Sequence, residues 1–185
     1  MPILVAYAGD DGSTRETAES ISSYLAEDFP PTKVLPLTDV NPSVIPTYTA
    51  IVIGSTIHDT QWLPNAIAFL HDNSTALAEV PIYAFSVGAP AAMPKFIQGQ
   101  WQKSEEKKIA QAIEKELKVK HPVLRGHKLF NENVEKEHAG RYTRAFFTRC
   151  GDHFGDAGNW KDVQKWAKKV AEDLRKPREK QGNGD

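Results

Sequence analysis

The sequence contains one cysteine, two methionines and no long uninterrupted run of apolar residues. A single cysteine, Cys150, excludes an internal disulfide and any cysteine-rich metal site, and its own role stays open. No window approaches the roughly 18 apolar residues that a membrane-spanning helix needs, so no membrane span is expected. The first residues also lack the basic segment of a signal peptide. We therefore expect a cytoplasmic protein.

Neither sign of charge is in large excess, since the net charge is −1, but the charge is unevenly spread. Residues 1–100 carry ten acidic and three basic side chains, a net charge of −7. Residues 101–185 carry fourteen acidic and twenty basic side chains, a net charge of +6. The basic residues of this second half alternate with acidic ones, as on solvated helix faces with local ion pairs. The sequence therefore predicts no nucleic-acid partner.

Short apolar runs followed by small polar residues are typical of buried parallel strands. The strongest runs are residues 3–7, 50–53 and 82–85, and weaker ones are residues 33–37 and 128–130. Helical spacing of apolar residues lies between and after them, at residues 13–25, 63–70, 109–117 and 160–174. Ser13 or Thr14 is the expected cap of the first helix, and Asn159 that of the last.

This alternation of strand and helix predicts a doubly wound α/β fold, with a five-stranded parallel sheet and helices on both faces. Residues 1–175 are expected to form a single domain. Residues 176–185 contain no apolar side chain, and we expect a disordered tail there.

In a doubly wound sheet, ligands bind beyond the carboxyl ends of the strands, where the strand order reverses. Three predicted loops lie there, at residues 8–14, 54–62 and 86–93. The first joins a strand directly to a helix, and its glycines and the hydroxyls of Ser13 and Thr14 suit a phosphate group. An equally good interpretation is that Ser13 only caps the helix. With the other two loops beside it, the edge suits a mononucleotide that carries an aromatic group.

Three side chains of the second loop are candidates for chemistry or recognition. His58 suits an acid or base near neutral pH, and Asp59 beside it could orient the imidazole. A solvent-facing loop histidine is the alternative. Trp62 suits stacking on a flat ring, or packing at a helix start. No ligand spacing in the sequence supports a metal site.

The sequence resembles the flavodoxin-like proteins, and within them it is most similar to the menaquinone-dependent protoporphyrinogen dehydrogenase branch. The resemblance covers about residues 2–175. Its motifs are VAYA at residues 5–8, GSTRETA at 12–18, YTAIVIGSTI at 48–57, FSVG at 85–88 and NWKD at 159–162. It implies a flavodoxin-like α/β fold, with a helical insertion around residues 101–125.

The resemblance also implies the cofactor FMN. The phosphate would lie at residues 9–14 and the isoalloxazine ring against residues 55–62 and 86–93. The cofactor-binding residues carried over in this way are Gly9, Asp10, Asp11, Gly12, Ser13, Thr14, Ser55, Thr56, Ile57, His58, Trp62, Ser86, Val87, Gly88 and Ala89. The catalytic candidates are His58 and Asp59.

The loop departs from the family pattern in two ways. Gly9 stands where the family usually has Ser or Thr, and Asp10 and Asp11 add negative charge where a phosphate would bind. The leading interpretation is an FMN-dependent oxidoreductase acting on a quinone or a small organic substrate. These departures favour the alternative, a flavodoxin fold that has lost FMN and works as a cofactor-independent acid/base enzyme such as a lyase, isomerase or cyclase. An electron carrier that docks to a redox partner protein, and a homodimer, also stay open.

Overall fold

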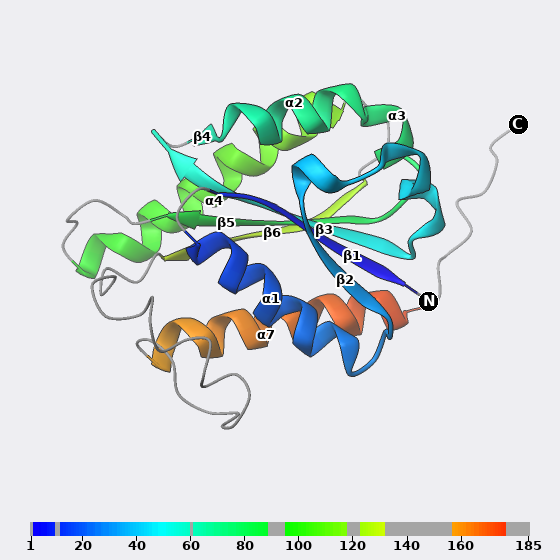
Figure 1. Cartoon of the computed structure of the whole chain (residues 1–185). Helices are drawn as coiled ribbons and strands as arrows, with labels where there is room; N and C mark the ends of the chain where they lie inside the picture. The colour runs from blue at the N-terminus through cyan, green and yellow to red at the C-terminus, as the bar shows by residue number, and fades with distance from the viewer. Residues whose placement is uncertain are drawn as a thin grey trace, which may run out of the picture.

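The computed structural model describes residues 2–9, 12–59, 61–88, 95–117, 123–131 and 157–176 of the chain. Strands and helices alternate along it (Figure 1). The strands are β1 (Ile3–Ala8), β2 (Thr32–Pro36), β3 (Ala50–His58), β4 (Gln61–Trp62), β5 (Ile82–Gly88) and β6 (Leu124–Asn131). The α-helices are α1 (Ser13–Ala26), α2 (Pro64–Asp72), α3 (Ser74–Leu77), α4 (Lys95–Leu117) and α7 (Ala157–Arg175). Two 3-10 helices, η1 (Leu37–Asp39) and η2 (Pro42–Thr47), lie between β2 and β3.

Five strands pair in parallel in the order β2-β1-β3-β5-β6, and the short β4 pairs antiparallel with the end of β3. The central β1 is hydrogen-bonded on both sides, with Val5 opposite Val34 of β2 and Val52 of β3. The chain first moves outward from β1 to β2 and then crosses back to β3. The strand order therefore reverses between β1 and β3, and ligands of such sheets bind at the carboxyl end of this boundary.

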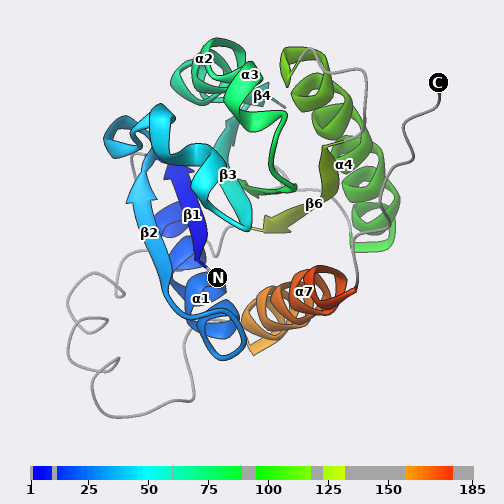
Figure 2. The ribbon, with the colours of Figure 1, turned by 90° about the vertical axis from the view of Figure 1, so that its right-hand side faces the viewer.

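Helices cover both faces of the sheet (Figure 2). Helices α2, α3 and α4 lie on one face, and α1 and α7 lie side by side on the other. Successive side chains of β1 alternate between two buried clusters, since Leu4 and Ala6 pack under the first layer while Ile3 and Val5 pack under the second. The two cores account for the near-continuous apolar runs of the central strands.

The second core contains an aromatic cluster that fixes the middle of β3 and β5. The rings of Phe85, Phe130 and Trp166 lie with centroids 5.8–6.5 Å apart. Phe85 also lies against Gly54, where an added Cβ would be 2.0 Å from the Phe85 ring. The strand can therefore pass Phe85 only because residue 54 has no side chain.

The predicted doubly wound fold is confirmed, and each of the five predicted strands is present. The predicted insertion at residues 101–125 is wrong, because α4 is the crossover helix that joins the neighbouring parallel strands β5 and β6. Its apolar stripe at Ile109, Ile113 and Leu117 packs in the first core. None of the helices that the structure describes has the length and apolar content needed to cross a membrane.

Both predicted helix caps are wrong. The N-cap of α1 is Gly12, in the left-handed region with φ of 84°, so the N-cap residue has no side chain with which to cap this helix. Helix α7 begins at Ala157, so Asn159 lies inside its first turn. The predicted tail, apart from Lys176, lies outside the described residues.

Candidate functional site

The carboxyl ends of β1 and β3 meet the start of α1, and this junction is the centre of the candidate site. Strand β1 ends at Ala8, and α1 begins at Ser13 behind Gly12. A side-chain oxygen of the N-cap residue often bonds the first N–H groups of a helix, but the N-cap of α1 is a glycine, which has no side chain to offer. Together with the dipole of a 14-residue helix, this start favours an anion.

Two buried threonines close the junction from below. The side-chain oxygens of Thr14 and Thr56 are 2.7 Å apart, and the two residues are 0% and 5% exposed. A Cβ added to Gly9 would lie 2.8 Å from both hydroxyl oxygens. Gly9 therefore has no room for the Ser or Thr that the resemblance implies at this position, because the hydroxyls of Thr14 and Thr56 already fill that space.

The predicted second loop is largely strand. Residues 54–58 continue β3, and the chain then turns back so that Ile57 pairs with Trp62 and His58 with Gln61 in a short hairpin. Asp59 turns the hairpin with φ of 49°, a left-handed conformation that Asp tolerates. His58 and Asp59 are both exposed at this hairpin. The structure thus places the two catalytic candidates at the rim of the carboxyl edge.

Trp62 points into the protein. It is 4% exposed, and its ring nitrogen donates a 2.7 Å hydrogen bond to the hydroxyl of Ser86. On the neighbouring strand, the hydroxyl of Ser55 accepts from the backbone N–H of Leu63 at 3.1 Å and donates to the carbonyl of Thr56. Two buried serines therefore hold the segment that follows the hairpin.

The predicted third loop is also strand at its start. Ser86, Val87 and Gly88 belong to β5, and Ser86 and Val87 are buried. Val87 packs in the second core, whereas Ser86 faces the α2–α4 layer. Gly88 lies beside Ile57, where an added Cβ would be 3.2 Å from the isoleucine side chain. The ends of β3 and β5 thus form one continuous rim.

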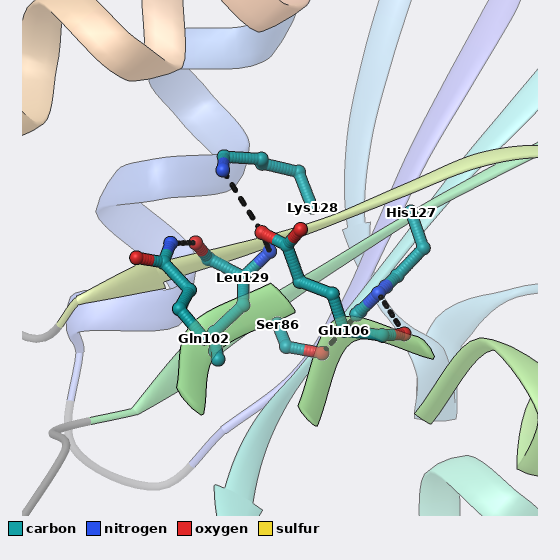
Figure 3. A network of polar contacts seen from close by, with 6 residues as sticks. All are labelled: Ser86, Gln102, Glu106, His127, Lys128 and Leu129. Atoms are coloured by element: carbon teal, nitrogen blue, oxygen red, sulfur yellow. Dashed lines mark hydrogen bonds and ion pairs between the residues drawn. The ribbon is translucent and has the colours of Figure 1, made fainter. Parts of the chain in front are cut away.

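His127 lies in the middle of β6, opposite Ala84 of β5, and the sequence analysis does not predict its contacts. Its Nε2 lies 2.8 Å from the hydroxyl of Ser86, and its Nδ1 lies 3.1 Å from the backbone oxygen of Glu106 in α4 (Figure 3). Burial lowers the pKa of His127 to about 4, so the imidazole is neutral at neutral pH. Nothing local in the sequence indicates this residue, because its partners come from β5 and α4.

The structure brings most of the predicted site residues to one edge. Gly9, Gly12, Ser13 and Thr14 lie at its β1–α1 end. The residues from Ser55 to Trp62 lie on β3 and the hairpin, and Ser86, Val87 and Gly88 on β5. Predicted residues outside the described part of the chain are Asp10, Asp11 and Ala89, and Cys150 is outside it too. Within the described part, no three of the His, Cys, Asp and Glu residues cluster as metal ligands would.

A shallow hollow of about 510 Å³ lies beside the hairpin, between α2 and α4. Trp62 and Ile67 supply apolar walls, and His71 and Glu116 lie at one end with 3.2 Å between the Nδ1 and Oε2 atoms. None of the residues that line this hollow belongs to β1 or to the start of α1. We therefore place the candidate site at the carboxyl edge, where the strand-order reversal and the glycine-capped start of α1 coincide.

Comparisons with known proteins agree with this topology. The family model described as a flavodoxin domain matches residues 4–121. No curated protein matches the sequence. The structure is similar to oxidised flavodoxin 2 from Bacillus cereus, with 18% identity, a TM-score of 0.60 and coverage of 94% of this chain and 99% of that one. It is also similar to a flavodoxin from the domain Archaea, with 15% identity, a TM-score of 0.55 and coverage of 95% and 100%.

A third similar structure is the rubredoxin oxygen:oxidoreductase of Desulfovibrio gigas, with 11% identity and a TM-score of 0.55. The match covers 94% of this chain and 36% of that larger protein. At these identities the solved structures are evidence for the fold, whereas the family model matches more than half of the sequence itself. The chain therefore belongs to the flavodoxin domain family.

Proposed function

We propose that this protein is an FMN-binding redox protein, and that it acts as an oxidoreductase. The observation that carries the proposal is the start of α1, which lies at the strand-order reversal and has a left-handed glycine, Gly12, as its N-cap. Backbone N–H groups at such a helix start are suitable donors for a phosphate. The match to the flavodoxin domain supports the same ligand.

The residues at the junction suit a phosphate that is bound by backbone rather than by hydroxyls. Thr14 and Thr56 bond each other below the loop, and Gly9 has no hydroxyl to offer. The left-handed Gly12 has open space where a Cβ would be, so the backbone can approach a ligand closely. We infer that main-chain N–H groups of residues 12–15 would supply most of the phosphate contacts.

The ring of the cofactor would lie along the rim formed by β3 and β5. Ile57 and Gly88 contribute its floor, and His58 and Asp59 stand exposed at the hairpin beside it. When bound, FMN would supply the transfer of a hydride or of single electrons. In the proposal, His58 orients the ring or the substrate by hydrogen bonding, and Asp59 turns the hairpin that presents it.

The substrate side of the proposal is broader. A quinone or a small organic molecule is the proposed acceptor, in keeping with the resemblance to the menaquinone-dependent protoporphyrinogen dehydrogenase branch. The alternative is an electron carrier that serves a redox partner protein. Either protein would act in the cytoplasm, as a monomer or as a homodimer. Single-turnover oxidation of the reduced protein by a soluble quinone separates the two, since a carrier alone would react slowly without its partner.

The direct test is FMN titration of the purified full chain, followed by flavin fluorescence and calorimetry. We expect saturable binding of one FMN, which should weaken when phosphate is removed and riboflavin is used instead. Replacing Asp10 and Asp11 with Asn should tighten FMN by roughly fivefold per charge at low salt, because the loop then loses like charge beside the phosphate. Asp72→Asn, an exposed change in α2, is the matched control and should have no effect.

One result would contradict the proposal, and a second would revise the part that Asp10 and Asp11 play in it. A protein that shows no heat and no thermal shift with excess FMN does not use this cofactor. Tighter FMN binding by the wild type than by the Asn variants would assign the two carboxylates a positive role. The first result would favour the cofactor-independent acid/base enzyme, in which Asp10, Asp11 and His58 would act on an organic substrate.

A further inference from the structure

A continuous chain of hydrogen bonds runs through the α2–α4 side of the sheet, from the hairpin to the crossover helix. It begins at the ring nitrogen of Trp62, which is 2.7 Å from the Ser86 hydroxyl. It continues over 2.8 Å from that hydroxyl to Nε2 of His127, and over 3.1 Å from Nδ1 to the Glu106 carbonyl. Figure 3 shows the imidazole of His127 between Ser86 and Glu106, so that β5, β6 and α4 each contribute one residue.

The direction of every proton in this chain follows from its two ends. The carbonyl of Glu106 can only accept, so Nδ1 of His127 carries the hydrogen. In the neutral ring Nε2 must then accept, and the hydroxyl of Ser86 donates to it. The same hydroxyl oxygen accepts from the indole N–H of Trp62, which can only donate. The histidine tautomer and the serine rotor are thus both determined by the geometry.

The surroundings keep the imidazole in this neutral form. Burial is the largest influence on its pKa, which lies near 4, although Glu106 acts in the opposite direction. The Glu106 carboxylate is itself held by Nζ of Lys128 at 2.9 Å and by the backbone N–H of Leu129 at 3.1 Å (Figure 3). The charged groups facing His127 are therefore the Glu106 carboxylate, which raises the pKa of the imidazole, and the Lys128 ammonium, which lowers it.

The far end of the chain holds the wall of the candidate site. Trp62 pairs with Ile57 in the hairpin, one residue from His58. Leu63, the next residue, is held separately by Ser55. We propose that His127 is a positioning residue, which fixes the Ser86 hydroxyl and through it the indole of Trp62, and so sets the hairpin that carries His58. This role rests on the proposed function for its consequence, but its geometry is independent of any ligand.

One consequence concerns recognition of a flat ring. The indole of Trp62 could turn outward to stack on a ligand only if its bond to Ser86 were broken, since the residue is 4% exposed. Trp62 therefore acts as a fixed wall behind the rim. The rim formed by the ends of β3 and β5 is therefore preorganised, and we expect it to keep its shape when a ligand binds.

The test follows the indole N–H of Trp62 in the ligand-free protein, by nitrogen–proton correlation spectra assigned with Trp62→Phe. In the wild type this signal should exchange slowly with water. His127→Leu should speed its exchange by about tenfold, because the serine loses its acceptor, and His127→Gln should restore much of the protection, because its amide oxygen can accept in place of Nε2. His71→Gln, on the exposed side of α2, is the matched control.

A second pair of variants keeps the proposal testable if the His127 variants fold poorly. Ser86→Ala should release the indole signal and Ser86→Thr should retain it, since Thr keeps the hydroxyl. Acidification should also move the Trp62 signal with the midpoint of His127 in the wild type, and not in His127→Gln. An indole signal that is unchanged in His127→Leu and Ser86→Ala, or that moves equally in the His71 control, overturns the positioning role.

The FMN readout separates this inference from the proposed function. If both hold, His127→Leu should weaken FMN binding by about tenfold while His127→Gln stays close to wild type. If FMN does not bind at all but the indole signals respond as stated, the positioning role stands and the cofactor assignment fails. If FMN binds equally to all variants while the indole signals respond, the hairpin is positioned but does not contribute to binding, which overturns the link to the site.

Discussion

The hydroxyls of Thr14 and Thr56 lie 2.7 Å apart and join the first turn of α1 to the end of β3. Both residues are buried, and the backbone of Gly9 passes over them so closely that a Cβ there would be 2.8 Å from either oxygen. The side chains of Thr14 and Thr56 therefore fill the space beneath Gly9 at the junction where the strand order reverses. A ligand at this junction would contact backbone groups and not the two threonine hydroxyls.

Introducing a serine at position 9 should damage this junction. Gly9→Ser restores the residue type that the resemblance implies, but its Cβ would overlap Thr14 and Thr56. We expect a loss of about 1–3 kcal/mol in the free energy of unfolding, as for other overpacked sites, and no gain in FMN affinity. Urea denaturation followed by circular dichroism measures the first, and FMN titration the second.

The double variant Gly9→Ser, Thr56→Ala is the control, because it removes one of the two overlapping hydroxyls. It should recover part of the lost stability. If Gly9→Ser is as stable as the wild type and binds FMN more tightly, the junction opens readily and the closed threonine pair does not describe the functional state.

The fold could be predicted because its determinants are local. Apolar runs at β1, β3 and β5 and the stripe on α7 are each visible within a few residues of sequence, and their alternation leaves few topologies. The sequence wrongly predicts loops at the ends of β3 and β5, because what determines these ends is not visible in the local pattern. Ser55 and Ser86 are polar and small, which is typical of loops, but both hydroxyls are buried and hydrogen-bonded, Ser55 with Leu63 and Ser86 with the more distant Trp62 and His127.

The candidate site was predictable only in outline. The edge that carries it follows from the topology, and the glycine before the first helix is visible in the sequence. His127 could not be predicted, because its partner Ser86 is 41 residues away in sequence. The lack of space for a side chain at Gly9 could not be predicted for the same reason, since Thr56 comes next to Gly9 only when β1 and β3 pair in the sheet.

Stability should depend on pH through His127. Its pKa is lowered from 6.5 to about 4 in the folded protein, chiefly by burial, so below pH 6.5 the unfolded chain binds the extra proton. The free energy of unfolding is therefore unaffected by His127 above about pH 6.5, and it decreases as the pH falls from 6.5 toward 4. This shift corresponds to a change on the order of 3 kcal/mol in the free energy of unfolding.

Denaturation midpoints measured between pH 4 and 7 check this expectation. In His127→Gln the same series should show a clearly shallower fall, because the variant has no titrating ring at this position. Identical slopes in the wild type and His127→Gln would mean that His127 titrates alike in the folded and unfolded chains.

Two adjacent carboxylates of α4 should respond in opposite ways to removal. Glu105 is 3% exposed; its Oε1 accepts from Nζ of Lys108 at 2.8 Å, but its buried Oε2 has no hydrogen-bond partner in the described part of the chain. A buried carboxylate with an unmet oxygen is costly, and Lys108 is 65% exposed and loses little when released. Glu105→Leu should therefore raise the free energy of unfolding by about 1–2 kcal/mol.

Glu106→Leu is the matched comparison and should lower it by about 1–3 kcal/mol, because it leaves the buried N–H of Leu129 without its acceptor. Thermal and urea denaturation of the two variants decide the matter, and destabilisation by Glu105→Leu would show that this carboxylate has a structural or functional partner.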